Sequence, residues 1–319
     1  MVDARPDTTK SWGVHLRGIS ALLKRLPLPR NPEFDVRAQL WFYFAVIANY
    51  FKVGGAFPAE LTNWSRERSD LVTNTTEPSC ELIDILIGIV RFCANIQRYR
   101  AFSALYKALD LELALQTWIE RLPPQWSFAS QQSDTANTVG TFYGRYHVYH
   151  DEWTARILNH YYLGRLLVNE IILAYASQLG ECTAEWFQQK QYSLTVVSEM
   201  ATEICTGVAT QGFFAEPGNG SFGGTRLLMK GVFMTIFPLT VAASATGVPD
   251  KLRDWVIERL RMMGNRTGIG QALDAISRIQ NAAANQAQGG LAPTCQSLAR
   301  SVDDRYHPKS VGFVVPSSG

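Results

Sequence analysis

Apolar side chains recur at three- and four-residue steps along most of this chain, which is the spacing of one face of an α-helix. The pattern is longest over residues 141–179, where one face carries Trp153, Ile157, Tyr161, Val168, Ile171 and Tyr175. No stretch shows convincing alternation of apolar and polar residues, the mark of a half-buried strand. The sequence therefore predicts an all-α fold of about ten helices with no sheet.

The helices are expected to form one domain over residues 12–285. Its length and its 46% of apolar residues are sufficient for a sizeable core. The polar, Ser- and Gln-rich segment within 123–140 predicts an exposed internal loop. Residues 1–11 and 286–319 are weakly patterned, and we expect an N-terminal tail and a flexible C-terminal tail. The expected helices are 12–26, 36–51, 81–100, 101–122, 141–179, 184–210, a buried one within 231–247, 248–263 and 267–285.

Charge and cysteine content exclude several classes of function. Thirty basic and 28 acidic residues give a net charge of +2, so the bulk charge does not favour direct binding to nucleic acid. The five cysteines are scattered, which argues against a disulfide framework or a structural zinc site and favours an intracellular protein. The longest uncharged apolar run, 231–247, is too short and too interrupted to predict a membrane span.

Candidate chemistry gathers at the start of the longest helical pattern. Tyr146, His147, His150 and Asp151 are the residues we would expect to transfer protons if the chain is an enzyme. On a helix, His147, His150 and Asp151 would share one face. A metal would need further ligands, so we expect none, and a polar structural cluster remains the alternative. The glycines at 218, 220 and 223 have the spacing of a dinucleotide fingerprint but no preceding strand, so no cofactor is expected.

Four phrases, in order, resemble the regulatory (middle homology) domain of fungal-specific transcription factors of the binuclear zinc cluster class. The resemblance covers residues 12–284, and its phrases are HLRGISALLKRL at 15–26, YHDEWTARILNHYYLGRLLVNEII at 149–172, TIFPLTVAASATGVPDKLRDWVIERLRMM at 235–263 and GIGQAL at 268–273. It implies an all-helical regulatory region. The family's DNA-binding module needs six closely spaced cysteines, and this chain departs from the family there.

The departure leaves three interpretations open. The first is a regulator-like protein of a fungus, tied to secondary metabolism, that acts in the nucleus through a protein partner, either a DNA-binding regulator or a second copy. The second is the same helical scaffold used in the cytoplasm as a cofactor-free enzyme on a small aromatic or prenylated metabolite. Its reaction would be a cyclisation or isomerisation such as an intramolecular alkoxylation. The third is an inert, truncated remnant.

The segment 248–263 has the clearest start and stop signals of a helix. Pro249 lies in its first turn, Asp250 follows it, and Gly264 is expected to end it. Its apolar face carries no charged residue and consists of Leu252, Trp255, Val256, Leu260 and Met263. We therefore expect this face, with Trp255, to pack inward against another helix.

Overall fold

The structure is a computed structural model that describes residues 18, 32–53, 57, 78–133, 140–178, 184–212 and 229–288. Within these residues there are eight α-helices, two short 3₁₀ helices and two strands. In chain order they are α2 (Pro32–Val53), α5 (Pro78–Asn95), η2 (Ile96–Arg98), α6 (Ala101–Glu120), η3 (Pro124–Trp126), β1 (Phe128–Gln132), β2 (Arg145–Tyr149), α7 (Glu152–Gln178), α8 (Ala184–Gly212), α9 (Met229–Ser244), α10 (Asp250–Thr267) and α11 (Gly270–Ala287).

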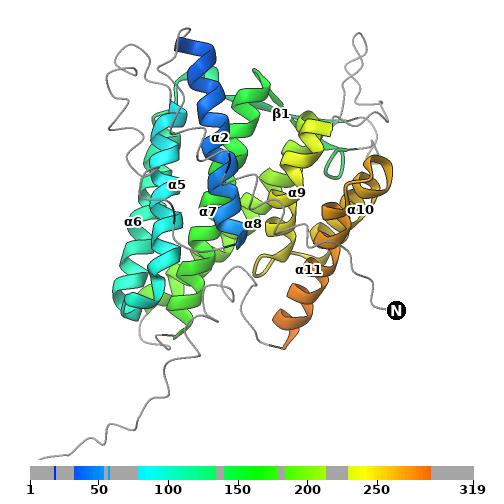
Figure 1. Cartoon of the computed structure of the whole chain (residues 1–319). Coiled ribbons are helices and arrows are strands. Elements are labelled where there is room, and N and C mark those ends of the chain that lie inside the picture. Colours follow the sequence, from blue (N-terminus) through cyan, green and yellow to red (C-terminus); the bar gives the residue numbers. More distant parts are fainter. Residues whose placement is uncertain are drawn as a thin grey trace, which may run out of the picture.

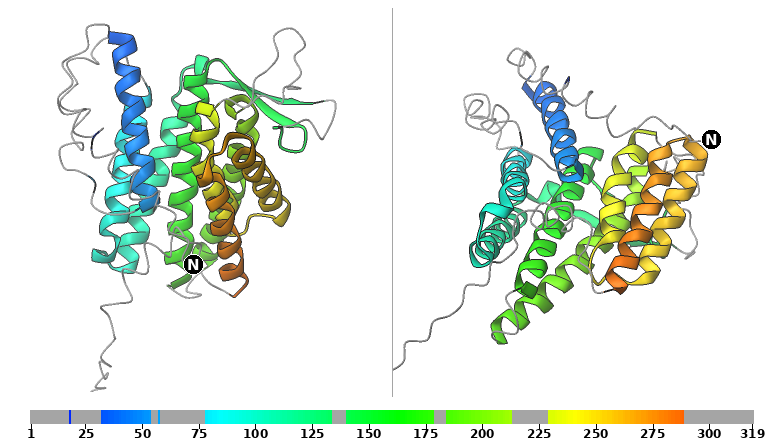
Figure 2. Two further views of the ribbon diagram at one scale, coloured as in Figure 1. Left: turned by 45° about the vertical axis from the view of Figure 1, so that its right-hand side comes forward. Right: turned by 60° about the horizontal axis from the view of Figure 1, so that its bottom comes forward.

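Helix α7 lies at the centre of the arrangement and is buried along most of its length. It contacts α5, α6, α8 and α9. Figure 1 shows α5 and α6 on one side of α7 and the group α9, α10 and α11 on the other. The two further views in Figure 2 show the same two groups, with α2 lying beside α5. One continuous apolar core joins side chains from all eight helices.

The mostly helical fold predicted from the periodicity is confirmed for the described residues. Helices α2, α5, α6, α8, α9 and α11 coincide with predicted ranges to within a few residues. Pro238 lies inside α9 and is buried, as predicted for the apolar run 231–247. The helix predicted at 12–26, apart from Gly18, and the glycine-rich segment 216–224 lie outside the described residues.

The helix predicted at 248–263 is longer than expected. Pro249 is its N-cap, and the helix continues through Gly264 to Thr267. A side chain at Gly264 would come within 2.8 Å of Leu273 on α11, so glycine here permits the two helices to approach closely. The helix ends instead at Gly268, whose φ of 73° is a left-handed conformation that favours glycine.

The prediction of no sheet is wrong. Strands β1 and β2 form an antiparallel pair, from Phe128 opposite Tyr149 to Gln132 opposite Arg145. The sheet occupies part of the segment 123–140 that was expected to be a loop. It also displaces the start of the helix predicted at 141, because Tyr143 and Gly144 have positive φ and reverse the chain there.

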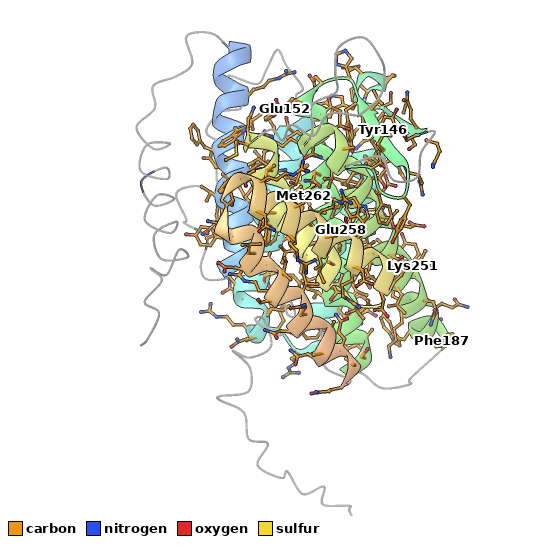
Figure 3. The ribbon with its side chains drawn as sticks, turned by 90° about the vertical axis from the view of Figure 1, so that its right-hand side faces the viewer. Tyr146, Glu152, Phe187, Lys251, Glu258 and Met262 are labelled. Carbon is orange, nitrogen blue, oxygen red and sulfur yellow. The ribbon has the colours of Figure 1, made fainter. Side chains whose placement is uncertain are left out.

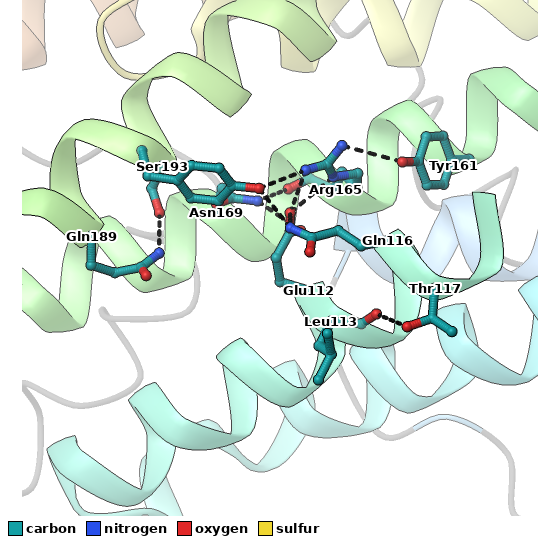
Figure 4. Close-up of polar contacts among 10 residues, drawn as sticks. Glu112, Leu113, Gln116, Thr117, Tyr161, Arg165, Asn169, Gln189 and Ser193 are labelled. Carbon is teal, nitrogen blue, oxygen red and sulfur yellow. Dashed lines mark hydrogen bonds and ion pairs between the residues drawn. The ribbon is translucent and has the colours of Figure 1, made fainter. Parts of the chain in front are cut away.

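A largely buried polar network joins α6 and α7 and extends to the exposed Tyr192 on α8. The Glu112 carboxylate accepts hydrogen bonds from Arg165 Nη2 at 2.6 Å, Arg165 Nε at 2.9 Å and Asn169 Nδ2 at 2.8 Å. Figure 4 shows these contacts together with Gln116. The Gln116 side chain also donates a hydrogen bond of 2.6 Å to the hydroxyl of Tyr192 on α8. Although burial disfavours the charge on Arg165, the contacts with Glu112 raise the pKa of Arg165 overall, so its guanidinium stays charged in the interior.

Candidate functional site

The four sequence-predicted site residues lie on a strand and a turn, so the predicted helical face is wrong. Tyr146 and His147 belong to β2, and His150 and Asp151 lie in the turn between β2 and α7. Side chains alternate between the two faces of a strand, which gives Tyr146 and His147 different surroundings. Figure 3 labels Tyr146 on the hairpin, beside the body of helices.

His147 lies between the hairpin and α8 and is fully buried. Its Nδ1 lies 3.1 Å from Ser130 Oγ, because Ser130 is its direct partner across the sheet. On its other side, Nε2 lies 3.0 Å from Glu203 Oε2. That second pair of atoms is close but not aligned for a hydrogen bond, so the buried Nε2 makes no hydrogen bond in this arrangement. The ring of Phe128 also packs on the imidazole, with centroids 4.4 Å apart.

Two buried tyrosines complete the surroundings of Glu203. Burial, followed by the charge of Glu203, raises the pKa of Tyr149 above its ordinary value. Burial likewise raises the pKa of Tyr162, and the neighbouring Tyr149 and Glu203 add to the effect. Both phenols are therefore neutral at physiological pH. A side chain at Gly207 would come within 2.9 Å of the Tyr149 hydroxyl, so glycine allows Tyr149 to lie directly against α8.

The other three predicted residues have separate local roles. The Tyr146 hydroxyl donates to Gln131 Oε1 at 2.7 Å across the sheet. The side chain of His150 is exposed. The Asp151 carboxylate accepts a hydrogen bond of 2.7 Å from the backbone N–H of Thr154, which makes it the cap of α7. Partial burial opposes ionisation of Asp151, but the Thr154 hydrogen bonds and the charge of Arg37 lower its pKa overall.

Ser130 and Glu203, which the sequence did not single out, are the groups that reach His147. Ser130 is exposed, whereas His147 is buried and the side chain of Glu203 is about one quarter exposed, at 24%. Such a chain of groups can accept the Ser130 hydroxyl proton on Nδ1 and stabilise the resulting imidazolium with Glu203. Residue 203 is remote in sequence from 147, so only the fold brings them together.

The start of α7, by contrast, has a signal in the sequence: Asp151 followed by Thr154 is a capping pattern that indicates a helix start at 152.

No group of three or more His, Cys, Asp or Glu side chains able to hold a metal ion occurs in the part of the chain that the structure describes. Among the same residues, no helix has both the length and the apolar character needed to cross a membrane.

A second feature of the described surface is a stripe of exposed apolar side chains on α6. Phe102, Tyr106 and Leu113 are exposed by 52%, 59% and 61%, and the partly buried Leu109 lies between them. Their steps of four, three and four residues place all of them along one face of the helix. We call these four residues the α6 stripe.

The first turns of α8 carry three further aromatic residues, of which Trp186 is partly buried and the other two are exposed. Trp186 on α8 meets Tyr106, with ring centroids 6.4 Å apart. Phe187 is 64% exposed and Tyr192 is 44% exposed. Figure 3 shows Phe187 at the edge of the molecule, directed away from the core. Exposed apolar side chains aligned on one helix face, as in the α6 stripe, are typical of sites that bind another protein.

No protein-family model, curated protein or solved structure matches this chain.

Proposed function

We propose that the chain is a regulator-like protein that acts through a protein partner, in the nucleus and in the control of secondary metabolism. The observation that carries this proposal is the α6 stripe with its aromatic neighbours on α8. Large side chains such as Phe102 and Tyr106 lose favourable burial energy when they face water, and a partner surface restores it. The nuclear location and the link to secondary metabolism rest on the family resemblance of residues 12–284.

Three of the four predicted proton-transfer residues, Tyr146, His150 and Asp151, support this proposal by their separate contacts. Tyr146 bonds within the hairpin, and Asp151 caps α7. His150 is exposed, and its Nδ1 lies 4.0 Å from an Asp151 oxygen. These contacts are those of a polar structural cluster, which is the alternative to the acid–base constellation that the cyclase interpretation requires.

A deletion strain of the source organism tests the proposal. For a regulator, we expect transcripts of a whole set of biosynthetic genes to fall together. The strain is then complemented with wild type, with a Tyr106→Glu/Leu113→Glu variant, and with Met229→Glu as a control at another exposed apolar position. We expect wild type and Met229→Glu to restore the transcripts. The Tyr106→Glu/Leu113→Glu variant should fail to restore them although its protein level is normal. Normal transcripts in the deletion strain would overturn the proposal.

A second candidate function is a cofactor-free enzyme, and the specific observation that favours it is the placement of His147 between Ser130 and Glu203. In that case the deletion strain keeps normal transcripts and accumulates one late intermediate. Complementation with Ser130→Ala, which removes the hydroxyl beside His147 Nδ1, should then leave the intermediate in place. A Ser130→Ala strain that behaves as wild type would exclude Ser130 from the chemistry.

A further inference from the structure

The spacing of the α6 stripe restricts the kind of surface that can cover it. Steps of four, three and four residues are those of the a and d positions of a coiled coil, whose side chains interdigitate with the same positions of a second helix. The stripe is therefore shaped for a helix lying along α6. It contains two aromatic residues, Phe102 and Tyr106, at its N-terminal end and two leucines, Leu109 and Leu113, at its C-terminal end.

This order makes the stripe complementary to itself when two copies of α6 run in opposite directions. Phe102 of one copy then faces Leu113 of the second copy, and Tyr106 faces Leu109 of the second copy. Each of these pairs forms one layer of the interface, and the same two layers repeat on the other side of the two-fold axis. Every layer thus pairs one aromatic ring with one smaller aliphatic side chain. A parallel pairing would instead place Phe102 on Phe102 and Leu113 on Leu113, with layers of unequal size.

The charges beside the stripe agree with the antiparallel arrangement. On the side of α6 away from α7, the exposed residues next to the stripe are Ser103, Lys107 and Asp110. Near the two-fold axis, Lys107 of one copy approaches Asp110 of the second copy, and the reverse contact forms by symmetry. Opposite charges therefore meet at the rim of the seam, where like charges would oppose association.

We propose that the α6 stripe is a homodimer interface in which two copies of α6 pack antiparallel about a two-fold axis. The proposal rests on the proposed function in one respect, since it names the partner of the same surface. Four layers along one helix pair form a contact smaller than the ~1,600 Å² of a standard protein–protein interface, so we expect a weak dimer, with a dissociation constant of about micromolar or above.

Cysteine cross-linking tests the register. Phe102→Cys and Leu113→Cys are made singly, and wild type under the same mild oxidation controls for the natural cysteines. Two copies of residue 102 lie about 16 Å apart in the antiparallel register, too far for a disulfide. Each single variant should therefore give no covalent dimer above the wild-type level, whereas an equimolar mixture of the two should give a reducible dimer. Cross-linking of either single variant with itself, or none in the mixture, would overturn the proposal.

Light scattering after size exclusion at high micromolar concentration tests the dimer itself. We expect dimeric wild type, at least about ten-fold weaker association for Leu113→Glu, and unchanged association for the control Met229→Glu. Because residue 113 is exposed, its variant should keep the wild-type melting temperature. A monomeric wild type would assign the stripe to a different protein and overturn this inference, whereas the proposed function fails only on the transcript measurement in the deletion strain.

Discussion

The side chain of Trp255 packs inward from α10, the orientation that the apolar face of this helix favours. It is 7% exposed, and its Nε1–H donates to the backbone oxygen of Thr141 at 3.1 Å. Phe142 packs edge-on against its ring, and the Arg259 guanidinium lies 5.5 Å from the ring centroid. The contacts with Thr141 and Phe142 join α10 to the turn that precedes β2.

We expect Trp255→Ala to lower the free energy of unfolding by about 3–5 kcal/mol, through lost burial and the cavity left behind. Trp255→Phe is the matched control, because it keeps most of the ring and removes the hydrogen bond, and it should lose clearly less. Urea unfolding of the three proteins measures both differences. If Trp255→Ala unfolds as wild type does, the helix-face assignment is wrong.

His160 should make stability depend on pH. Burial, with a smaller contribution from the charge of Arg156, lowers its pKa from 6.5 to about 4. The unfolded chain therefore binds a proton before the folded chain does. The stabilisation is complete above about pH 6.5 and is lost as the pH falls to about 4, by up to about 1.4 kcal/mol per pH unit.

The variant His160→Gln lacks this titration. The difference in unfolding free energy between wild type and His160→Gln should shrink as the pH falls from about 7 to about 4, by on the order of 3 kcal/mol. Urea unfolding at several pH values measures the difference, so acid effects from other groups cancel. A difference that stays constant with pH would show that residue 160 does not titrate within this range.

The carboxylate of Asp151 caps the N-terminus of α7. Asp151→Ala removes the acceptor for the Thr154 N–H and should destabilise the protein by about 1 kcal/mol. Asp151→Asn keeps an acceptor and should recover most of that loss, whereas a proton-transfer role would require the carboxylate. Thermal unfolding together with the complementation assay separates the two roles. Full stability with lost function in Asp151→Asn would favour proton transfer.

Among the contacts between helices, the ion pair of Glu112 with Arg165 is the one whose loss we expect to lower the free energy of unfolding most. The side chains are only 4% and 13% exposed. Glu112→Ala leaves the Arg165 charge buried without a carboxylate partner. We therefore expect the free energy of unfolding to fall by about 3–5 kcal/mol. Replacing both residues by methionine should lose much less, because no charge is left unpaired. Denaturant unfolding of single and double variants tests this, and equal losses would contradict it.

The sequence predicted the helices well because each follows from local spacing, which is a property of neighbouring residues. It failed at the hairpin because β1, FASQQ, has no apolar alternation and its pairing with β2 joins segments separated in the chain. The prediction of the site was incomplete for the same reason. His147 was found by its residue type, but its partners Ser130 and Glu203 come from other elements. Asp151 was found too, although its capping role was not recognised.

At the scale of the whole molecule, the balance of charge limits what the surface can bind. The net charge is +2. Several basic side chains already lie against acidic ones, as in Arg121 with Glu81, Arg253 with Asp250 and Lys230 with Glu152. Binding to DNA depends on neutralising several phosphates with basic groups, and paired basic groups contribute less to it.

We therefore expect the purified 319-residue chain not to bind duplex DNA site-selectively. A gel-shift titration at moderate salt with duplexes from promoters of the affected genes measures this, and a scrambled duplex is the control. Any weak retention should be equal for both duplexes and should vanish as salt rises, because it comes from phosphate contacts alone. Site-selective binding tighter than about micromolar would contradict the prediction. It would also remove the need for a DNA-binding partner, since the dimer could then recognise its targets directly.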